Sequence, residues 1–395
     1  MAAASRATDT TETLEALAAS REILVTCGSG GVGKTTTAAA IAAMAAVHLG
    51  GNVLVVTVDP ARRLATAMGI ERFGNAETPI PAEAFAAAGV EPRGQLSAAM
   101  LDTKASWDDL VTRHAPDAAT RDAILGNPLY ANISGRFVQS HDYIAMERLY
   151  DIHSSGRYDL IVVDTPPTRN AIDFLAAPER MADFFSSRLL RWLTAPYQSR
   201  VFAVASKPFM NVADRILGSQ FLADIAEFFM LFQTMHDGFV ERARAVQSLL
   251  SDRRTSFVVV STLEAAPVAE TTYFIDALAA DQLHLGAIVL NKVFPAYLRS
   301  TNATHAARAL TEDADQLAPA LAEVTGGLDA TAADVARVLR EVADRFLDFQ
   351  VVAKREAELR RDLADHADVL ASVPYLSDDI GDLGGLLEMG DHIWR

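Results

Sequence analysis

The chain has 395 residues; half of them are hydrophobic and 22% are charged, a composition typical of a globular protein with a large core. Acidic residues outnumber basic ones by 51 to 35, and the net charge of −16 disfavours broad binding to nucleic acid. The single cysteine, Cys27, excludes an intrachain disulfide and a metal site built from several cysteines of one chain.

Residues 1–20 are expected to form a mobile or weakly helical leader. They lack a basic region followed by an apolar stretch, so a secretory signal is not expected. The most apolar window, residues 38–49, is mostly alanine and too short to span a bilayer. We therefore expect a cytoplasmic protein with no transmembrane segment, and leave a peripheral association with the membrane open.

Apolar, strand-like runs then alternate with helical stretches. The expected strands span residues 23–27, 53–58, 96–101, 160–163, 257–260, 287–290 and 369–373. Continuous apolar runs separated by helices indicate a parallel sheet that is covered on both faces. The sequence therefore predicts an α/β fold with a doubly wound, mostly parallel sheet.

Two helical stretches interrupt this alternation. Residues 184–250 contain no strand pattern and are expected to form a helical subdomain, inserted between the two parts of the sheet domain at 21–183 and 251–395. Residues 304–350 are expected to form two helices hinged at Gly326 and Gly327.

The inserted segment is rich in phenylalanine, with nine of the chain's 18 between residues 184 and 239. One helix is expected over residues 212–250, and the spacings of three and four place several apolar side chains on one face of it. These are Phe221, Ile225, Phe228, Phe232, Met235 and Phe239. The stripe fits a groove for an apolar client and fits a packed interface equally well.

The main functional motif follows the first expected strand and precedes an alanine-rich helix. It reads Gly28-Ser29-Gly30-Gly31-Val32-Gly33-Lys34-Thr35, followed by Thr36. This run matches the P-loop pattern G-x-x-x-x-G-K-[ST] in the strand–loop–helix context that the pattern requires. In such loops backbone N–H groups surround the phosphates, the lysine reaches the β- and γ-phosphates, and the hydroxyl ligates Mg²⁺. The sequence therefore predicts a P-loop that binds ATP and Mg²⁺, with Lys34 and Thr35 in these roles.

A dinucleotide-binding loop is the alternative interpretation. Gly28, Gly30 and Gly33 match G-x-G-x-x-G, and Asp59 lies at a tolerable distance for an acid that binds ribose. That alternative explains neither the Lys34-Thr35 pair nor a second acid at Asp164. The nucleoside triphosphate interpretation is therefore preferred.

Two aspartates end expected strands. Asp164 follows four apolar residues, where P-loop proteins place the carboxylate that holds the metal shell. Asp59 ends another strand, where a carboxylate can activate the attacking water or simply cap the following helix.

Five segments together resemble the arsenite-pump ATPase family, which includes the ATPase that delivers tail-anchored membrane proteins. Residues 28–36 resemble its deviant P-loop K-G-G-V-G-K-T-T, residues 59–61 its switch I, and residues 164–168 its switch II, D-T-A-P-T. Residues 289–293 are similar to the strand whose Asn reads adenine, and residues 373–376 to the family's V-P-L-L stretch. The resemblance spans residues 21–395.

The resemblance implies a role for each matching position. Residues 30–36 bind phosphate and Mg²⁺, and Gly28 and Ser29 belong to the same nucleotide-binding loop. Asp164 holds the metal shell, and Asp59 activates water. Asn291 hydrogen-bonds adenine, and Pro374 completes the nucleotide-binding set. The resemblance also implies a nucleotide-driven dimer that rearranges a helical subdomain after switch II.

The sequence departs from the family at informative positions. Ser29 replaces the signature lysine that contacts the partner subunit's phosphates, so Arg62, Arg63, Arg169 or a paralogous subunit would have to supply that charge. No Cys-x-x-Cys zinc clasp and no arsenite-binding cysteines are present, so arsenite transport is not expected.

These observations predict a dimeric, Mg²⁺-dependent ATPase that captures or escorts a hydrophobic client, a protein segment or a lipid-like molecule. A regulatory or assembly module that binds ATP and hydrolyses it slowly is the alternative. The dimer is either a homodimer or a heterodimer with a paralogous ATPase subunit.

Overall fold

A central sheet organises the computed structural model, which describes residues 13–58, 62–70, 74–130, 138–166, 176–177, 180, 183, 227–231, 234–324 and 331–395. In these residues eight strands are ordered β3-β4-β2-β5-β1-β6-β7-β8. The strands are β1 (Ile23–Cys27), β2 (Asn52–Thr57), β3 (Thr78–Pro79), β4 (Gln95–Met100), β5 (Leu160–Asp164), β6 (Thr255–Ser261), β7 (Leu285–Val293) and β8 (Val369–Pro374).

The sheet confirms the predicted fold class. All seven expected strands form, and they pair in parallel. The additional strand, β3, pairs antiparallel with β4 at one edge. Its two residues, one of them Pro79, are too few to give a periodic signal, and an edge is the place in a sheet where proline is tolerated.

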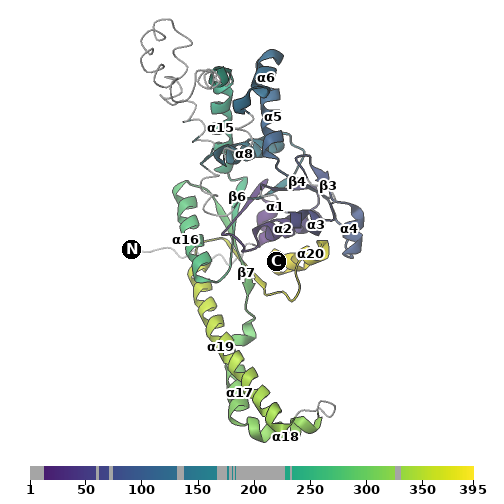
Figure 1. Ribbon diagram of the computed structural model, residues 1–395, viewed down its shortest axis with the longest axis vertical. Coiled ribbons are helices and arrows are strands. Elements are labelled where there is room, and N and C mark those ends of the chain that lie inside the picture. Colours follow the sequence, from purple (N-terminus) through teal and green to yellow (C-terminus); the bar gives the residue numbers. More distant parts are fainter. Residues whose placement is uncertain are drawn as a thin grey trace, which may run out of the picture.

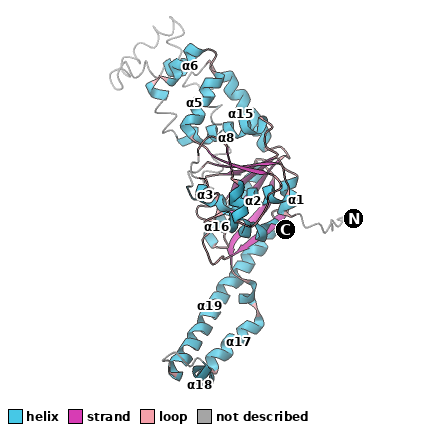
Figure 2. Ribbon diagram, turned by 90° about the vertical axis from the view of Figure 1, so that its right-hand side faces the viewer, coloured by secondary structure: helices cyan, strands magenta, loops and turns pink. Residues whose placement is uncertain are grey.

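Helices cover both faces of the sheet (Figures 1 and 2). Along β1, Ile23, Val25 and Cys27 belong to one apolar cluster and Leu24 to another, as expected for a strand buried on both faces. The first layer contains α1 (Leu14–Ala19), α2 (Lys34–His48), α4 (Ala82–Ala87) and α20 (Leu383–Trp394). The second contains α8 (Val138–Ser154), α16 (Ala265–Ala280) and the end of α15 (His236–Leu250).

The C-terminal helix α20 packs directly against α2. A Cβ at Gly390 would lie 2.3 Å from Met44 Cγ, so glycine lets the two helices approach without displacing the Met44 side chain. Trp394 is fully buried, and its ring stacks on His48 with 6.1 Å between centroids. The end of the chain therefore supports the helix that begins at the predicted P-loop.

A helical layer lies beyond one edge of the sheet, at the top of Figure 1. It consists of α5 (Thr103–His114), α6 (Ala118–Leu125), α8 and α15. Arg242 of α15 forms ion pairs with Glu147 and Asp151 of α8, and Arg113 of α5 also pairs with Asp151. Removing any one of these side chains would leave an uncompensated charge among the three helices.

The single helix expected over residues 212–250 is wrong in one respect. Residues 227–231 are helical, but Thr234 and Met235 form a turn before α15 begins at His236. Thr234 ends the preceding helix, because its hydroxyl and its N–H both donate to the Leu231 carbonyl. Phe221, Ile225 and Phe232 lie outside the described residues.

The described members of the apolar stripe are buried. Phe228, Met235 and Phe239 belong to the same cluster as Trp107 and Tyr143. In this structure these three side chains are part of a packed core between α5, α8 and α15.

A long arm leaves the sheet after β7 and returns before β8 (Figures 1 and 2). It contains the 3₁₀ turn η1 (Ala296–Arg299), α17 (Thr301–Glu312), α18 (Ala314–Val324) and α19 (Ala332–Ala364). The helical stretch is therefore longer than the expected 304–350, and its described residues form three helices, α17, α18 and α19, where two were expected. The expected hinge, Gly326-Gly327, lies outside the described residues.

One more short helix, α3, spans Arg62–Ala67. None of the helices in the described ranges combines the length and the apolar character needed to cross a membrane.

Replacing Trp394 with Ala should lower the free energy of unfolding by about 3–5 kcal/mol, because it leaves a cavity between α20 and α2. Urea unfolding followed by circular dichroism measures this change. Tyr273→Ala is the control, since that ring is 68% exposed on α16 and its loss should change stability by about 0.5 kcal/mol or less. Equal effects of the two substitutions would contradict the supporting role of α20.

Candidate nucleotide site

The predicted P-loop joins the central strand β1 to the N-terminus of α2. Gly31 and Gly33 have φ values of 83° and 96°, which favour glycine. A Cβ at Gly28 would lie 2.1 Å from the carbonyl oxygen of Val260 in the neighbouring strand β6. No atom lies within 4 Å of a Cβ built on Gly30 or Gly31, so the loop is open on that side. This is the form of a loop whose backbone closely approaches a ligand.

Lys34 is the first residue of α2 and is buried. Its Nζ donates to the carbonyl oxygen of Ser29, 3.1 Å away, so the ammonium group lies across the loop. An ammonium at a helix N-terminus adds its charge to the helix dipole. The two together favour an anion at this position.

Asp164, fully buried at the end of β5, connects three elements. Its Oδ2 accepts hydrogen bonds from Thr35 Oγ1 at 2.7 Å and from Thr57 Oγ1 at 2.9 Å. Strand register explains the meeting, because Asp164 pairs with Thr26 of β1 on one side and with Thr57 of β2 on the other. The structure therefore brings together Thr35 and Asp164, which the sequence predicted as metal-binding residues.

Thr57 is a site residue that sequence analysis missed. It ends an apolar strand without belonging to any motif, and only the pairing of β2 with β5 places it beside Asp164. The one available signal was its position two residues before Asp59.

The start of the predicted switch II is attached to the P-loop strand. Thr165 Oγ1 donates to the Thr26 carbonyl at 2.8 Å, and Thr26 Oγ1 donates to the Val163 carbonyl at 3.0 Å. A displacement of residues 165 and 166 would therefore break a bond to β1.

Asn291, in β7, also contacts the P-loop. Its Nδ2 donates to the Val32 carbonyl at 2.8 Å, and its Oδ1 accepts from Lys292 N at 2.9 Å. Pro374 lies at the end of the adjacent strand β8, in register with Val293. The two predicted base-side residues therefore lie at neighbouring strand ends, and the adenine-reading role of Asn291 stays a prediction.

Ser29 and Cys27 flank the beginning of the loop. Ser29 is buried, and its hydroxyl has no hydrogen-bond partner among the described residues. Burial raises the pKa of the Cys27 thiol far above its ordinary value, so the thiol stays protonated and packs as an apolar group.

Several predicted residues lie outside the described part of the chain. These are Asp59 and the switch II residues beyond position 166, including Arg169. Arg62 and Arg63 begin α3, where the structure describes the backbone alone.

Comparison with known proteins assigns the chain to a family. The family model described as anion-transporting ATPase matches residues 21–316. The chain belongs to the anion-transporting ATPase family. The resemblance drawn from the motifs is thus confirmed, and membership of a family of ATPases supports ATPase activity.

Three relatives illustrate the range of similarity. The ATPase ASNA1 homolog of Leishmania infantum is 32% identical over 196 residues, which cover 43% of this chain and 47% of that protein. ATPase BagA of Mycobacterium tuberculosis is 24% identical over 381 residues, 93% of this chain and 90% of that protein. ATPase get3 of Pyrenophora tritici-repentis is 26% identical over 272 residues, 68% of this chain and 73% of that protein.

The close approach at Gly28 gives a prediction that concerns the loop itself. Gly28→Ala should destabilise the protein by about 1–3 kcal/mol, because the clash is with strand backbone and cannot be relieved by a side-chain rotation. Gly30→Ala, which meets open space, is the matched control and should leave the melting temperature nearly unchanged. Equal melting temperatures for the two variants would show that β1 and β6 are less closely packed here than the structure indicates.

Proposed function

We propose that this chain is a Mg²⁺-dependent ATPase whose nucleotide cycle opens and closes a dimer and thereby captures or escorts a hydrophobic client. The observation that carries the ATPase part is the cluster in which Asp164 accepts hydrogen bonds from Thr35 and Thr57 beside the P-loop. Hydroxyl and carboxylate oxygens are the ligands that Mg²⁺ prefers, so the residues present fit this ion.

Each residue of the loop has a distinct task in this proposal. The backbone N–H groups between Gly30 and Thr36 bind the phosphate oxygens, and Lys34 offsets their charge. Thr35 and Asp164 would hold the metal ion beside the phosphates. When bound, the ion supplies positive charge that stabilises the transferring phosphoryl group. Asp59, two residues beyond β2, orients and deprotonates the attacking water.

The base of the nucleotide is assigned to the ends of β7 and β8. Asn291 is held by its bond to Val32, which fixes its amide against the loop. Its amide oxygen and nitrogen have the hydrogen-bonding capacity to read an adenine edge, and Pro374 adds an apolar surface next to it.

The client is the part of the proposal that rests on the sequence pattern. Half of the chain's phenylalanines lie in residues 184–239, within the predicted insertion. Phe228 and Phe239 are packed between helices, so capture would require this layer to open and exchange contacts within the core for contacts with an apolar client. A nucleotide-driven rearrangement of two subunits would supply the free energy for that exchange.

Ser29 favours a second candidate, an assembly module that binds ATP and hydrolyses it slowly. Serine carries no charge to offer to a partner subunit's phosphates, and its hydroxyl is buried in the loop. In this candidate, binding of ATP promotes dimerisation, and a paralogous subunit supplies the missing cation.

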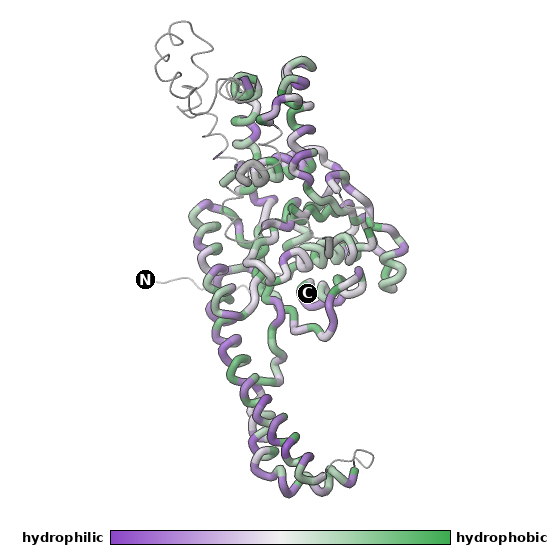
Figure 3. Tube along the Cα trace, in the orientation of Figure 1, coloured by the Kyte–Doolittle hydropathy of each residue, from purple (hydrophilic) through white to green (hydrophobic). Residues whose placement is uncertain are grey.

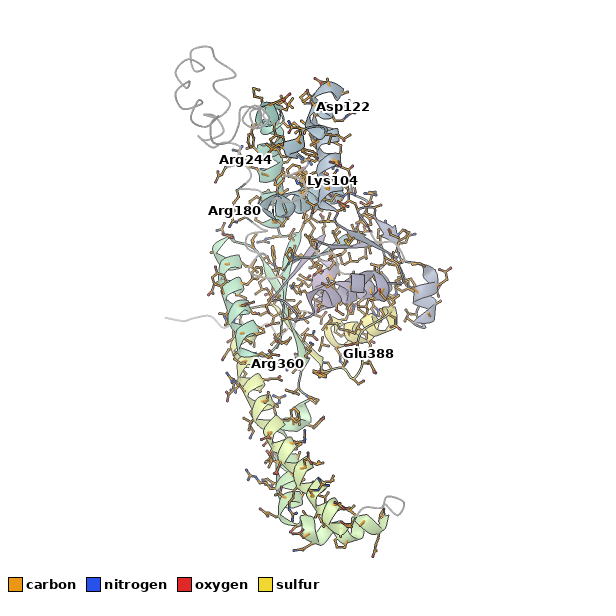
Figure 4. The ribbon with its side chains drawn as sticks, viewed as in Figure 1. Lys104, Asp122, Arg180, Arg244, Arg360 and Glu388 are labelled. Atoms are coloured by element: carbon orange, nitrogen blue, oxygen red, sulfur yellow. The ribbon has the colours of Figure 1, made fainter. Side chains whose placement is uncertain are left out.

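Lys34→Ala should abolish tight ATP binding, because the phosphates lose a fixed cation. Asp59→Asn should keep ATP binding and reduce hydrolysis by about a hundredfold or more, because the water is no longer activated. Calorimetry measures binding, and phosphate release measures turnover. Lys104→Ala is the control, since this lysine is exposed on α5 (Figure 4) and pairs with Asp108 of the same helix. Wild-type turnover by Asp59→Asn would show that the water-activating residue is misassigned.

The purified chain alone should hydrolyse ATP slowly, because two closed nucleotide sites gather negative charge that Ser29 cannot offset. Supplying the charge with Ser29→Lys, or with a paralogous subunit, should raise turnover by about tenfold or more. If an arginine substitutes instead, combined replacement of Arg62, Arg63 and Arg169 with Ala should abolish the residual activity. If the lone chain hydrolyses ATP fast and keeps this rate after the triple replacement, neither an arginine of this chain nor a paralogous subunit is needed to supply the charge.

A further inference from the structure

Thr57 has no task of its own in the proposed nucleotide cycle, although its side chain is fully buried at the end of β2. Residues 53–56, which precede it in the strand, are buried and apolar, and hydrophobic residues predominate around the central sheet (Figure 3). Valine has nearly the same shape as threonine and would fill this position without a polar atom. A buried hydroxyl costs free energy unless it forms a hydrogen bond. The contacts of the Thr57 hydroxyl are therefore informative.

Three polar side chains meet on the face of the sheet that α2 covers. Thr26, Asp164 and Thr57 are level with one another in the register of β1, β5 and β2. The residues two positions before them belong to the apolar cluster that contains α2; these are Leu24, Val162 and Val55. Because side chains along a strand alternate with a period of two, the three polar residues lie on that same face.

The two threonines that flank Asp164 use their hydroxyls differently. Both side chains are fully buried. Thr26 Oγ1 donates to the main-chain carbonyl of Val163 at 3.0 Å. Thr57 Oγ1 donates to Oδ2 of the Asp164 carboxylate at 2.9 Å. Two threonines of equal burial at the same level thus serve different groups, Thr26 the main chain of β5 and Thr57 the carboxylate at its end.

The same carboxylate oxygen also orients Thr35. Thr35 Oγ1 donates to Asp164 Oδ2 at 2.7 Å. A hydroxyl has one proton and two lone pairs. Because the proton of Thr35 is directed to Asp164, its lone pairs are left for a cation beside the loop. The orientation of the Asp164 carboxylate therefore decides where Thr35 presents its lone pairs.

Thr57 is the firmly held member of this group. Its strand lies between β4 and β5. Leu101 N donates to the Thr57 carbonyl at 3.0 Å, and Val58 N donates to the Asp164 carbonyl at 3.2 Å. Thr35, by contrast, is half-buried in the first turn of α2. Since strands hold side chains more precisely than loops do, Thr57 supplies the fixed point of the group.

We propose that Thr57 is a positioning residue, which acts through Asp164 on Thr35 and makes the cation site selective for Mg²⁺ over larger ions. This inference rests on the proposed Mg²⁺-dependent binding of ATP. Mg²⁺ requires short ligand distances and nearly octahedral geometry, whereas Ca²⁺ accepts longer distances and flexible geometry. Without the Thr57 hydroxyl the Asp164 carboxylate gains freedom to rotate. A larger ion tolerates that rotation better than Mg²⁺ does.

Thr57→Val tests the proposal, because it removes the hydroxyl and keeps the shape of the side chain. Calorimetry with AMPPNP, which resists hydrolysis, measures nucleotide affinity in EDTA, in Mg²⁺ and in Ca²⁺. The factor by which Mg²⁺ strengthens binding should fall by about tenfold or more, since losing a group that orients a metal ligand costs this much in metal affinity. The factor for Ca²⁺ should fall by about threefold or less. Affinity in EDTA should be unchanged, because the loop and Lys34 bind the phosphates without the ion.

Thr26→Val is the matched control, since it removes an equally buried hydroxyl and one hydrogen bond from the neighbouring strand. Both substitutions should lower the melting temperature by similar amounts, because each loses one buried hydrogen bond. Only Thr57→Val should reduce the Mg²⁺ factor, whereas a role confined to stability would change the melting temperature alone. Thr57→Ser, which keeps the hydroxyl, should restore the Mg²⁺ factor.

A further variant covers the case in which Thr57→Val does not fold. Thr57→Cys places a weaker donor at the same position, and its Mg²⁺ factor should fall by about threefold or more. The proposal would be overturned by a wild-type Mg²⁺ factor in the folded variants that lack the hydroxyl, or by no recovery in Thr57→Ser. Equal losses for Mg²⁺ and Ca²⁺, or an equal loss in Thr26→Val, would also overturn it.

The same measurements separate this inference from the proposed function. If Mg²⁺ does not strengthen nucleotide binding by the wild-type chain, the proposed Mg²⁺-dependent ATPase fails, and the role of Thr57 fails with it. If Mg²⁺ strengthens binding equally in the wild type and in Thr57→Val, the proposed function stands and the role of Thr57 alone is wrong.

Discussion

The site depends on the parallel register of three central strands. Because β1, β5 and β2 run side by side, Thr26, Asp164 and Thr57 lie level with one another at the carboxyl edge of the sheet. Asp164 can then accept hydrogen bonds from Thr57 of a neighbouring strand and from Thr35 of the helix that follows the loop. A buried carboxylate is tolerated there because these hydroxyl groups replace part of its lost hydration. A slip of one residue would point Asp164 to the opposite face of the sheet and remove the site.

The rest of the fold keeps this edge in place. α20 closes over α2 through the buried Trp394, which supports the helix that carries Lys34 and Thr35. On the side of the helical layer, Arg242 connects α15 to α8, the helix that leads into β5. The candidate nucleotide site and the buried Phe228 and Phe239 are therefore linked through α8 and α15, which contribute to both apolar clusters.

A second connection leads from the loop to the arm. Asn291 contacts the P-loop at Val32, and three residues later Phe294 N is held by Glu356 of α19. Burial raises the pKa of Glu356, while the bond from Phe294 partly opposes that rise. The arm is thus attached within a few residues of the loop. The helix attached in this way, α19, has 33 residues.

Local patterns in the sequence determined the strands, the P-loop and the family, because buried parallel strands are continuous apolar runs and phosphate binding requires glycines at fixed spacing. They also predicted Thr35 and Asp164, which the fold brings together through a hydrogen bond. Thr57 could not be found in this way, because its role comes from strand pairing between residues more than a hundred positions apart. The burial of Phe228 and Phe239 likewise depended on packing against α5 and α8, which helical periodicity does not contain. The turn at Met235 follows the hydrogen bonds of Thr234 to the Leu231 carbonyl, which the apolar spacing does not show. The apolar spacing on α19 was present in the sequence, but only the folded arm showed which of its faces is buried and which is exposed.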